Sequence, residues 1–426
     1  MLADLLLTNI GQLVGITQPG TRTKRAFSAQ DFQIAQGVSL ACERGKIVWI
    51  GSSDSLPPLA PHCVTYDARG NVVVPGLIDS HTHMIYAGER VEEFAWRLAG
   101  SSYTEIADRG GGINTTVRAV RNASDSELGV QTRHRLQRAL SCGITTVEIK
   151  SGYGLNTADE LRCLEIVGQL HREGPWELVP TFLGAHVVPP EFVNNRADYL
   201  QLLIEEMLPA VAKAGAAQFC DVFCDRGAFD VAEARRVLTA ARQLGMRLKL
   251  HADELSSCGG AELAAELGCI SADHLLCISP AGVNSLAASQ TVATLLPGTA
   301  LFLGLPFGRA RELIERGIPV ALATDSNPGS CPTENLLLMG NLACVQMRMS
   351  PLEALIGMTI HGAMALGLEQ HLGSLEQAKQ ADFVICDVER YEQLFYQLGA
   401  NHVRQVYKRG RLVFDADASR TARFPG

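Results

Sequence analysis

Between residues 72 and 327 the chain repeats one pattern, in which a short apolar run is followed by an amphipathic or alanine-rich stretch. The runs are VVVPGLIDSH (72–81), ITTVEIK (144–150), WELVPTFLGAH (176–186), QFCDVFCD (218–225), LKLHADE (248–254), CISADHL (269–275), TVATLLPG (291–298) and PVALATDSN (319–327). The stretches 160–174 and 231–245 are typical of the helices between them. Buried strands that alternate with helices in this way predict an α/β fold, a (β/α)8 TIM-like barrel.

The two ends of the chain show a different pattern of short strands and turns. KIVWIG (46–51), ADFVICDV (381–388) and HVRQVYKRGRLVFD (402–415) alternate or end in glycine-containing turns. We therefore predict that residues 1–70 and 368–426 together form a small β-sandwich domain, and that residues 71–367 form the barrel.

Composition and charge narrow the class of protein. Hydrophobic residues make up 47% of the 426 residues, which is enough for a large core, and the formal net charge of −8 argues against a nucleic-acid binder. The twelve cysteines include no CxxC pair, as in a cytoplasmic protein with reduced thiols. The N-terminal stretch MLADLLLTNIGQLV has neither a basic segment nor a long apolar run, so we expect no signal peptide and no membrane span.

Polar residues gather where the predicted strands end, which is where barrels of this kind carry their active sites. The residues in question are His81, His83, Lys150, Tyr153, His186, Cys224, Asp225, His251, Glu254, His274 and Asp325. His81 and His83 are two residues apart on one strand and therefore face the same side. Together with His251 and Asp325 they form a ligand set that suits zinc or iron and leaves a position for water. A lone strand-end histidine is more often a hydrogen-bonded core residue, so the prediction depends on the joint arrangement.

Several longer motifs carry a resemblance to a known family. DSHTHMIYAGERVEEF (79–94), EIKSGYGL (148–155), TFLGAHVVPPE (181–191) and TDSNPGS (324–330) resemble the amidohydrolase superfamily, and within it the members that act in histidine degradation. This resemblance implies that a metal-activated water hydrolyses the cyclic amide of 4-imidazolone-5-propanoate to N-formimidoyl-L-glutamate. Two other functions stay open, namely deamination of a purine or pyrimidine and a non-catalytic scaffold on the same fold.

The resemblance also implies how many metal ions to expect. Binuclear members bridge two ions with a modified lysine at the end of the fourth strand, where this chain has Cys224 and Asp225. Lys150 ends the second strand instead. We therefore expect one ion, Zn or Fe, on His81, His83, His251 and Asp325, with Lys150 as a possible buried partner of Glu148.

The resemblance also implies a substrate pocket around that ion. We expect Arg90 to bind the propanoate carboxylate, although it could instead pair with Glu92 or Glu93. Tyr103, Tyr153 and His186 should contact the ring. Asn327, Gly329 and Ser330 lie in a turn whose exposed backbone N–H groups could bind the reacting end, although Pro328-Gly329 could simply reverse the chain.

Three residues are candidates for proton transfer. Glu254 is expected to hold the ring N–H and carry a proton to the leaving nitrogen, and Asp325 could accept the water proton. His274 would orient the water or stabilise an oxyanion, or else only support a metal ligand. We further expect a small-molecule substrate, no nucleic-acid or membrane partner, and a homodimer in the cytoplasm.

Overall fold

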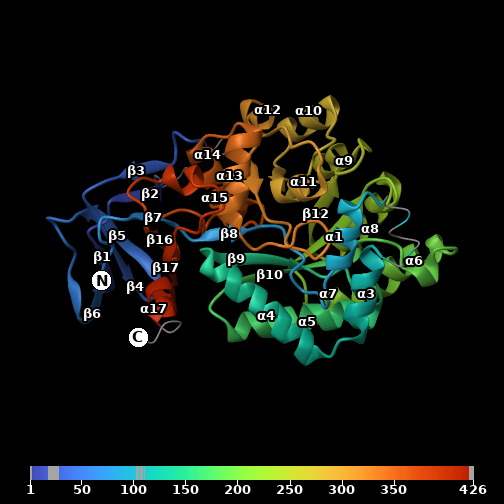
Figure 1. Ribbon diagram of the computed structural model, residues 1–426, viewed down its shortest axis with the longest axis horizontal. Helices are drawn as coiled ribbons and strands as arrows, with labels where there is room; N and C mark the ends of the chain where they lie inside the picture. Colours follow the sequence, from blue (N-terminus) through green and yellow to red (C-terminus); the bar gives the residue numbers. More distant parts are fainter. Residues whose placement is uncertain (1, 18–27, 102–104, 106–108, 110, 422–426) are drawn as a thin grey trace.

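The chain folds around a sheet of eight parallel strands (Figure 1). The computed structural model describes residues 2–17, 28–101, 105, 109 and 111–421. The strands are β8 (Leu77–Asp79), β9 (Ile144–Lys150), β10 (Glu177–Ala185), β11 (Phe219–Cys224), β12 (Arg247–Ala252), β13 (Ser271–His274), β14 (Val292–Leu295) and β15 (Val320–Leu322). They are hydrogen-bonded in chain order. Beyond the first and last strands, His83 N donates to Ser326 O and Asp325 N donates to His81 O, which brings the two edges together. The predicted TIM-like barrel is therefore confirmed, and each apolar run contains one of its strands.

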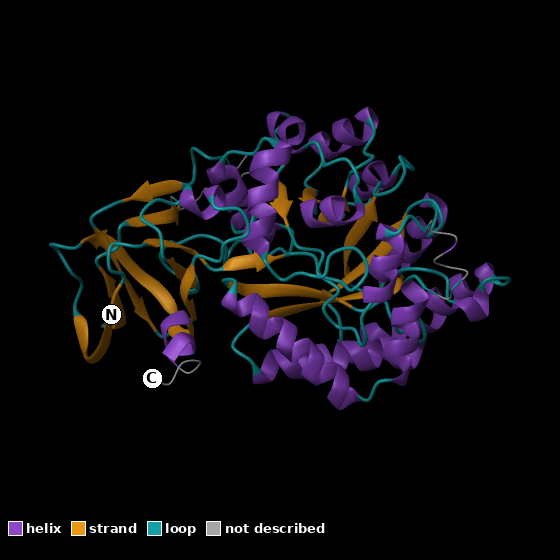
Figure 2. Ribbon diagram, in the orientation of Figure 1, coloured by secondary structure: helices purple, strands orange, loops and turns teal. Residues whose placement is uncertain are grey.

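Helices cover the outside of this barrel (Figure 2). They are α1 (Val91–Leu98), α3 (Ile113–Asn122), α4 (Asp125–Ser141), α5 (Thr157–Glu173), α6 (Arg196–Leu202), α7 (Leu208–Ala214), α8 (Val231–Gln243), α9 (Gly260–Glu266), α10 (Pro280–Ala288), α11 (Pro297–Leu303), α12 (Ala310–Glu315), α13 (Leu336–Met347), α14 (Pro351–Gly357) and α15 (Ile360–Met364). Several begin at side-chain caps that satisfy the first N–H groups, as at Ser124 of α4 and Asp230 of α8. No helix in the described part of the chain is both long and apolar enough to cross a membrane.

The two ends of the chain build two further sheets beside the barrel. One has the order β5 (Lys46–Ser52), β4 (Val38–Glu43), β1 (Ala3–Thr8), β6 (Leu59–Asp67), and the other has the order β18 (Arg411–Asp415), β17 (Val403–Lys408), β16 (Phe383–Cys386), β7 (Val72–Pro75), β2 (Gln12–Ile16), β3 (Gln33–Ala35). In Figure 1 the blue N-terminal strands and the red β16 and β17 lie together at one end of the molecule. Leu13, Val73 and Phe383 share one buried cluster, so N- and C-terminal segments share a core, as the sequence predicted.

The run VVVPGLIDSH does not form one barrel strand, as we had predicted, but two strands in different sheets. Residues 72–75 form β7, which pairs with β16, and only residues 77–79 form the barrel strand β8. The change of sheet falls at Gly76, where a Cβ atom would lie 2.4 Å from Thr145 Oγ1 of β9. Glycine permits this close approach, and Pro75 fits the end of a strand because it has no N–H to donate. The domain limits at residues 70 and 368 remain a proposal.

Candidate active site

A cavity of about 750 Å³ opens at the C-terminal ends of the barrel strands. The predicted site residues that line it are His83, Arg90, Tyr153, His186, His251, Glu254, His274, Asp325, Asn327, Gly329 and Ser330. His81 has no exposed surface and lies beneath the others. Tyr103 lies outside the described residues. The fold therefore brings together residues that are up to 249 positions apart in the chain, from His81 to Ser330.

Four side chains at the floor of this cavity present nitrogen and oxygen atoms to one small space. Oδ1 of Asp325 lies 3.4 Å from His83 Nε2 and 3.6 Å from His81 Nε2. His251 Nε2 lies 3.4 Å from His83 Nε2. Among the described residues His81 Nε2 is buried without a hydrogen-bond partner, which is costly unless a ligand binds there. The donor set of three imidazoles and one carboxylate fits a single zinc or iron ion.

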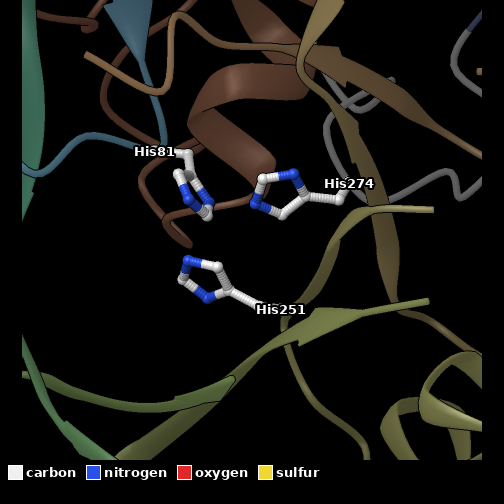
Figure 3. Close-up of side chains that lie close together, drawn as sticks. All are labelled: His81, His251 and His274. Atoms are coloured by element: carbon white, nitrogen blue, oxygen red, sulfur yellow. The ribbon is translucent and has the colours of Figure 1, made fainter. Parts of the chain in front are cut away.

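His274 is closer to this group than the sequence suggested. The ligand atoms of His81, His251 and His274 lie within 4.8 Å of one another, as do those of His81, His83 and Asp325. Figure 3 shows the rings of His81, His251 and His274 turned toward a common space. His274 is therefore a possible further ligand as well as a candidate catalytic group.

Carboxylates that the sequence analysis missed hold two of these rings. Asp273 Oδ2 lies 2.6 Å from His81 Nδ1, and Asp221 Oδ2 lies 3.0 Å from His251 Nδ1. Each contact favours a proton on Nδ1 and leaves Nε2 free to bind an ion. The signal that could have found them is a charged residue inside an apolar strand, because Asp221 and Asp273 interrupt QFCDVFCD and CISADHL.

The protonation of the histidines agrees with a ligand role. Burial, followed by the positive charge of Lys150 and of the neighbouring imidazoles, lowers the pKa of His81 well below its ordinary value. Burial and the proximity of His251 likewise hold the pKa of His83 well below that value. Both rings are therefore neutral at physiological pH, and a neutral imidazole has a lone pair to donate to a metal.

Lys150 pairs with Glu148 at 2.6 Å, which confirms the buried ion pair that we considered as its role. Its ammonium also lies 2.8 Å from Asp221 Oδ2. Burial alone would lower the pKa of Lys150, but Asp221, Glu148 and Asp273 together raise it above the ordinary value. An ammonium held in this way is not available as a modified, metal-bridging lysine.

Residues at three strand ends adopt the left-handed backbone region, which is rare for residues with a Cβ atom. Asp253, His274 and Asp325 have φ angles of 50°, 78° and 56°. Such conformations cost roughly 1–3 kcal/mol each and persist only when other contacts impose them. At Asp325 those contacts include the backbone bond to His81 O and the bond that Thr299 Oγ1 donates to Asp325 Oδ2, at 2.6 Å. Oδ1 of Asp325 is left to face the histidines.

Glu254 and His274 form a second polar group on the cavity wall. Oε2 of Glu254 lies 3.6 Å from His274 Nε2. Burial, followed by the charges of Asp325 and Asp225, raises the pKa of Glu254 well above its ordinary value. Burial lowers the pKa of His274 to about 3. Glu254 therefore keeps its proton to a higher pH than an ordinary glutamate does, while the His274 ring is neutral.

Arg90 makes the ion pair that we had considered as the alternative to substrate binding, and it also lines the cavity. Its Nε and Nη2 atoms lie 2.8 and 2.7 Å from Glu93 Oε2. A Cβ atom at Gly329 would lie 2.1 Å from Arg90 Nη1, so Nη1 rests against the Asn327–Ser330 turn. The pair with Glu93 therefore orients the guanidinium and leaves one of its amino groups on the cavity side.

The turn itself corrects one expectation. Gly329 N and Ser330 N both donate to Asn327 Oδ1, at 2.8 Å each, so these two N–H groups are not exposed for a ligand. Asn327 uses its amide to close the turn, with Nδ2 donating to Asp325 O at 2.7 Å. What the turn offers to the cavity is the small size of Gly329 and the side chain of Ser330.

Tyr153 and His186 line the cavity beside His83. The rings of His83 and His186 stack with centroids 5.1 Å apart, and those of Tyr153 and His186 are 5.4 Å apart. His186 Nδ1 lies 2.9 Å from Gly152 O, so Nδ1 carries the proton and donates it. Glu160 of α5, which the sequence analysis missed, holds this loop by accepting the N–H groups of Gly152, Gly154 and Leu155.

Comparison with known proteins places this site in a family. Residues 72–413 match the model of the amidohydrolase family. The imidazolonepropionase of Geobacillus thermodenitrificans is 48% identical over 413 residues, which covers 96% of this chain and 97% of that protein. The imidazolonepropionase of Alkaliphilus metalliredigens is 43% identical over 419 residues, which covers 97% and 99% respectively. The chain therefore belongs to the amidohydrolase family, and within it to the imidazolonepropionases.

Solved structures show the same fold at low sequence identity. An adenosine deaminase from Xanthomonas campestris with bound zinc is similar with a TM-score of 0.71 at 18% identity, covering 99% of this chain and 96% of that one. A mutant atrazine chlorohydrolase from Arthrobacter aurescens, complexed with zinc, gives a TM-score of 0.70 at 17% identity, covering 98% of both chains. These likenesses establish the architecture and not the substrate.

Proposed function

We propose that this chain hydrolyses the cyclic amide of 4-imidazolone-5-propanoate to N-formimidoyl-L-glutamate in histidine catabolism. The observation that carries the proposal is the 43–48% identity to curated imidazolonepropionases over 96–97% of the chain. The cavity supports it, because a single pocket is lined by Arg90, by Glu254 and by three of the four proposed metal ligands, His83, His251 and Asp325. That arrangement suits a ring amide with an anionic side chain.

The metal site is part of the same proposal. One ion, Zn or Fe, would be held by His81, His83, His251 and Asp325, whose ligand atoms already face one another. A bound ion of this kind supplies a water of lowered pKa and polarises a carbonyl group. The chain's own residues do the rest, namely hold the ring, exclude bulk water and move protons.

The proton steps fall to Glu254 and its neighbours. Water adds to the ring carbonyl carbon, the bond from that carbon to the ring nitrogen breaks, and the nitrogen must gain a proton. The pKa of Glu254 is raised by burial, so this carboxyl group keeps its proton to a higher pH than an ordinary glutamate, which suits delivery to that nitrogen. His274, neutral and 3.6 Å from Glu254, would orient the water or the developing oxyanion. Asp325 would accept the proton that the attacking water loses.

Residues that line the cavity would bind the substrate. Arg90, held by Glu93, would take the propanoate with its free amino group. Tyr153 and His186, beside His83, would contact the ring, with Asn327, Gly329 and Ser330 bounding the cavity near Arg90. Tyr103 stays a proposed contact. A cytoplasmic location and a homodimer also belong to this proposal, and light scattering of the purified protein tests the dimer.

Turnover of 4-imidazolone-5-propanoate, followed by the loss of its ultraviolet absorbance, tests the proposed function. We expect hydrolysis that stops when a chelator removes the metal and returns when zinc or iron is added back. A purine or pyrimidine deaminase would instead release ammonia from a neutral base, and the likeness to deaminase structures concerns the fold alone. Ammonia release without loss of the imidazolone would overturn the proposal.

A further inference from the structure

Directly beneath the histidines lies a layer of charged side chains with no exposed surface. Its members are Glu148 and Lys150 of β9, Asp221 of β11, Lys249 of β12 and Asp273 of β13. Charged groups are costly to bury unless they are paired, and even a paired buried charge adds little net stability compared with apolar residues. Their placement under the proposed metal site calls for a role connected with that site.

Two of these carboxylates each contact one proposed ligand. Asp273 Oδ2 lies 2.6 Å from His81 Nδ1, and Asp221 Oδ2 lies 3.0 Å from His251 Nδ1. Asp221 is fixed further because its Oδ1 accepts the backbone N–H of His251 at 3.1 Å. The direction in which each Nε2 points therefore depends on where the carboxylate behind the ring is held.

Lys150 is the cation between the two carboxylates. Its Nζ lies 2.8 Å from Asp221 Oδ2 and 3.9 Å from Asp273 Oδ2. A third partner, Glu148 at 2.6 Å, anchors the ammonium from its own strand, and Glu148 also accepts the N–H of Thr82, between His81 and His83. No contact joins Lys150 to the cavity itself, since its side chain is fully buried.

We propose that Lys150 is a positioning residue for the metal centre, which it serves by holding Asp221 and Asp273 against His251 and His81. The inference rests on the proposed metal site. Without the ammonium, Glu148, Asp221 and Asp273 repel one another at close range, and the two rings lose the carboxylates that orient them. One substitution beneath the site then disturbs two ligands at once, although it touches neither.

Lys249 provides a matched control, because it is an equally buried lysine in the same layer. Its Nζ lies 3.5 Å from Asp273 Oδ2 and otherwise donates to Ser271 Oγ at 2.8 Å, to Ser80 O at 3.2 Å and to Ala365 O at 3.4 Å. Among the described residues, Lys249 pairs with neither Asp221 nor Glu148. Its loss removes a buried cation of the same kind but leaves the bridge between the two carboxylates in place.

The test is the affinity of the purified full-length protein for Zn²⁺, measured by competition with a chromophoric chelator. Outer contacts of this kind typically contribute roughly 10–100-fold to metal affinity. We expect Lys150→Met to weaken Zn²⁺ binding by about that factor and to alter the visible spectrum of the Co²⁺-loaded protein. Lys249→Met should change both far less, with thermal unfolding measured for each variant to establish that it is folded.

The outcomes separate this inference from the proposed function. Equal Zn²⁺ affinity in wild type and folded Lys150→Met would overturn it, and so would equal weakening by the two lysine variants. Failure of the wild type to bind Zn²⁺ or iron would instead refute the proposed metal site. Should Lys150→Met not fold, Lys150→Met/Glu148→Gln removes one charge of each sign and keeps the net charge, and the same loss of affinity is expected of it.

Discussion

At the residue scale, the carboxyl group of Glu254 sits three positions beyond His251 and 3.6 Å from His274, on the cavity wall and outside the proposed ligand set. Burial raises its pKa, so the group keeps its proton at a pH where an ordinary glutamate has lost it. This is the property that a proton donor to the leaving nitrogen requires.

We predict that Glu254→Gln folds, binds metal and loses roughly 10²–10⁴-fold in kcat, the range for a positioned acid–base group. In the wild type kcat should fall as the pH rises through the raised pKa of Glu254, since the proton donor is then lost, and this alkaline limb should be absent in the variant. The measurement is the pH profile of kcat. Near-wild-type turnover of Glu254→Gln across pH would transfer the role to His274 or Asp325. Glu334→Gln is the matched control, because Glu334 borders the same cavity but is bound on both oxygens by Arg138.

Arg90 is the proposed anchor for the substrate's carboxylate. Because the propanoate is bound alike in the ground and transition states, Arg90→Ala should raise KM by roughly 10²-fold and change kcat much less. Arg90→Lys should recover only part, since an ammonium cannot reproduce the planar fork. The measurement is steady-state kinetics with the imidazolone and with an analogue that lacks the carboxylate. The analogue should be an equally poor substrate for wild type and for Arg90→Ala. If wild type hydrolysed the analogue much faster than Arg90→Ala does, Arg90 would only support its loop.

Gly329→Ala offers an independent control for the position of Arg90. The added Cβ would lie 2.1 Å from Nη1, and the far end of a flexible side chain can move aside with little loss of stability. KM should therefore rise while the unfolding midpoint stays near that of the wild type. In an Arg90→Ala background the same substitution should have no further effect on KM, because the two changes act through one contact.

At the element scale, the helices that cover the barrel depend on their caps, and α8 shows how. Asp230 and Glu233 form a capping box at its first turn, and Arg196 of α6 binds both oxygens of Glu233. The bonds from Arg196 outweigh partial burial and hold the pKa of Glu233 below its ordinary value of 4.5. The carboxylate therefore ties α8 to α6 as well as capping it.

We predict that Glu233→Gln lowers the free energy of unfolding by up to about 1 kcal/mol at pH 7, because glutamine can keep the capping bond to Asp230 N but loses the ion pair with Arg196. Because the pKa is lower in the folded than in the unfolded chain, the wild type holds this stability above pH 4.5 and loses it as the pH falls through the folded-state value. The difference between variant and wild type should thus shrink in acid. Urea unfolding at pH 7 and at a pH below the folded-state pKa of Glu233 measures this difference. Glu266→Gln, which breaks an exposed pair with Arg235, is the control and should change stability by less than about 0.5 kcal/mol.

At the scale of the whole molecule, the proposed ligands join the first, fifth and eighth barrel strands, β8, β12 and β15. An ion bound there would tie both edges of the eight-stranded sheet to its middle. Because such an ion binds the folded chain alone, it stabilises by about 2.7 kcal/mol when its free concentration is 100 times Kd.

We predict about one equivalent of zinc or iron per chain, following the ligand count. Removal of the metal by a chelator should lower the unfolding temperature, and addition of Zn²⁺ should restore it. Elemental analysis of protein purified without added metal, followed by thermal unfolding with and without chelator, provides both measurements. A stoichiometry near two would contradict the single-ion site inferred from Cys224, Asp225 and the ion-paired Lys150.

Much of the architecture followed from local pattern. The eight apolar runs set the barrel because strands and helices differ in the spacing of their buried positions. His81, His83, His251, Glu254, His274 and Asp325 were found at strand ends because a parallel barrel gathers those ends on one face. The motif TDSNPGS indicated the turn beside Arg90, although not that Asn327 would occupy its N–H groups.

Other features were decided only by contacts between residues far apart in the chain. Asp221 and Asp273 looked like isolated charges in apolar strands until the closed sheet placed them behind His251 and His81. Val72 to Pro75 were interpreted as barrel strand because a continuous apolar run looks the same in either sheet, and only their pairing with β16, some 310 residues later, placed them in the sheet beside the barrel. Local pattern determines whether a segment is buried and in what conformation. Only three-dimensional packing determines which partner it is buried against, because that choice depends on side chains hundreds of positions away.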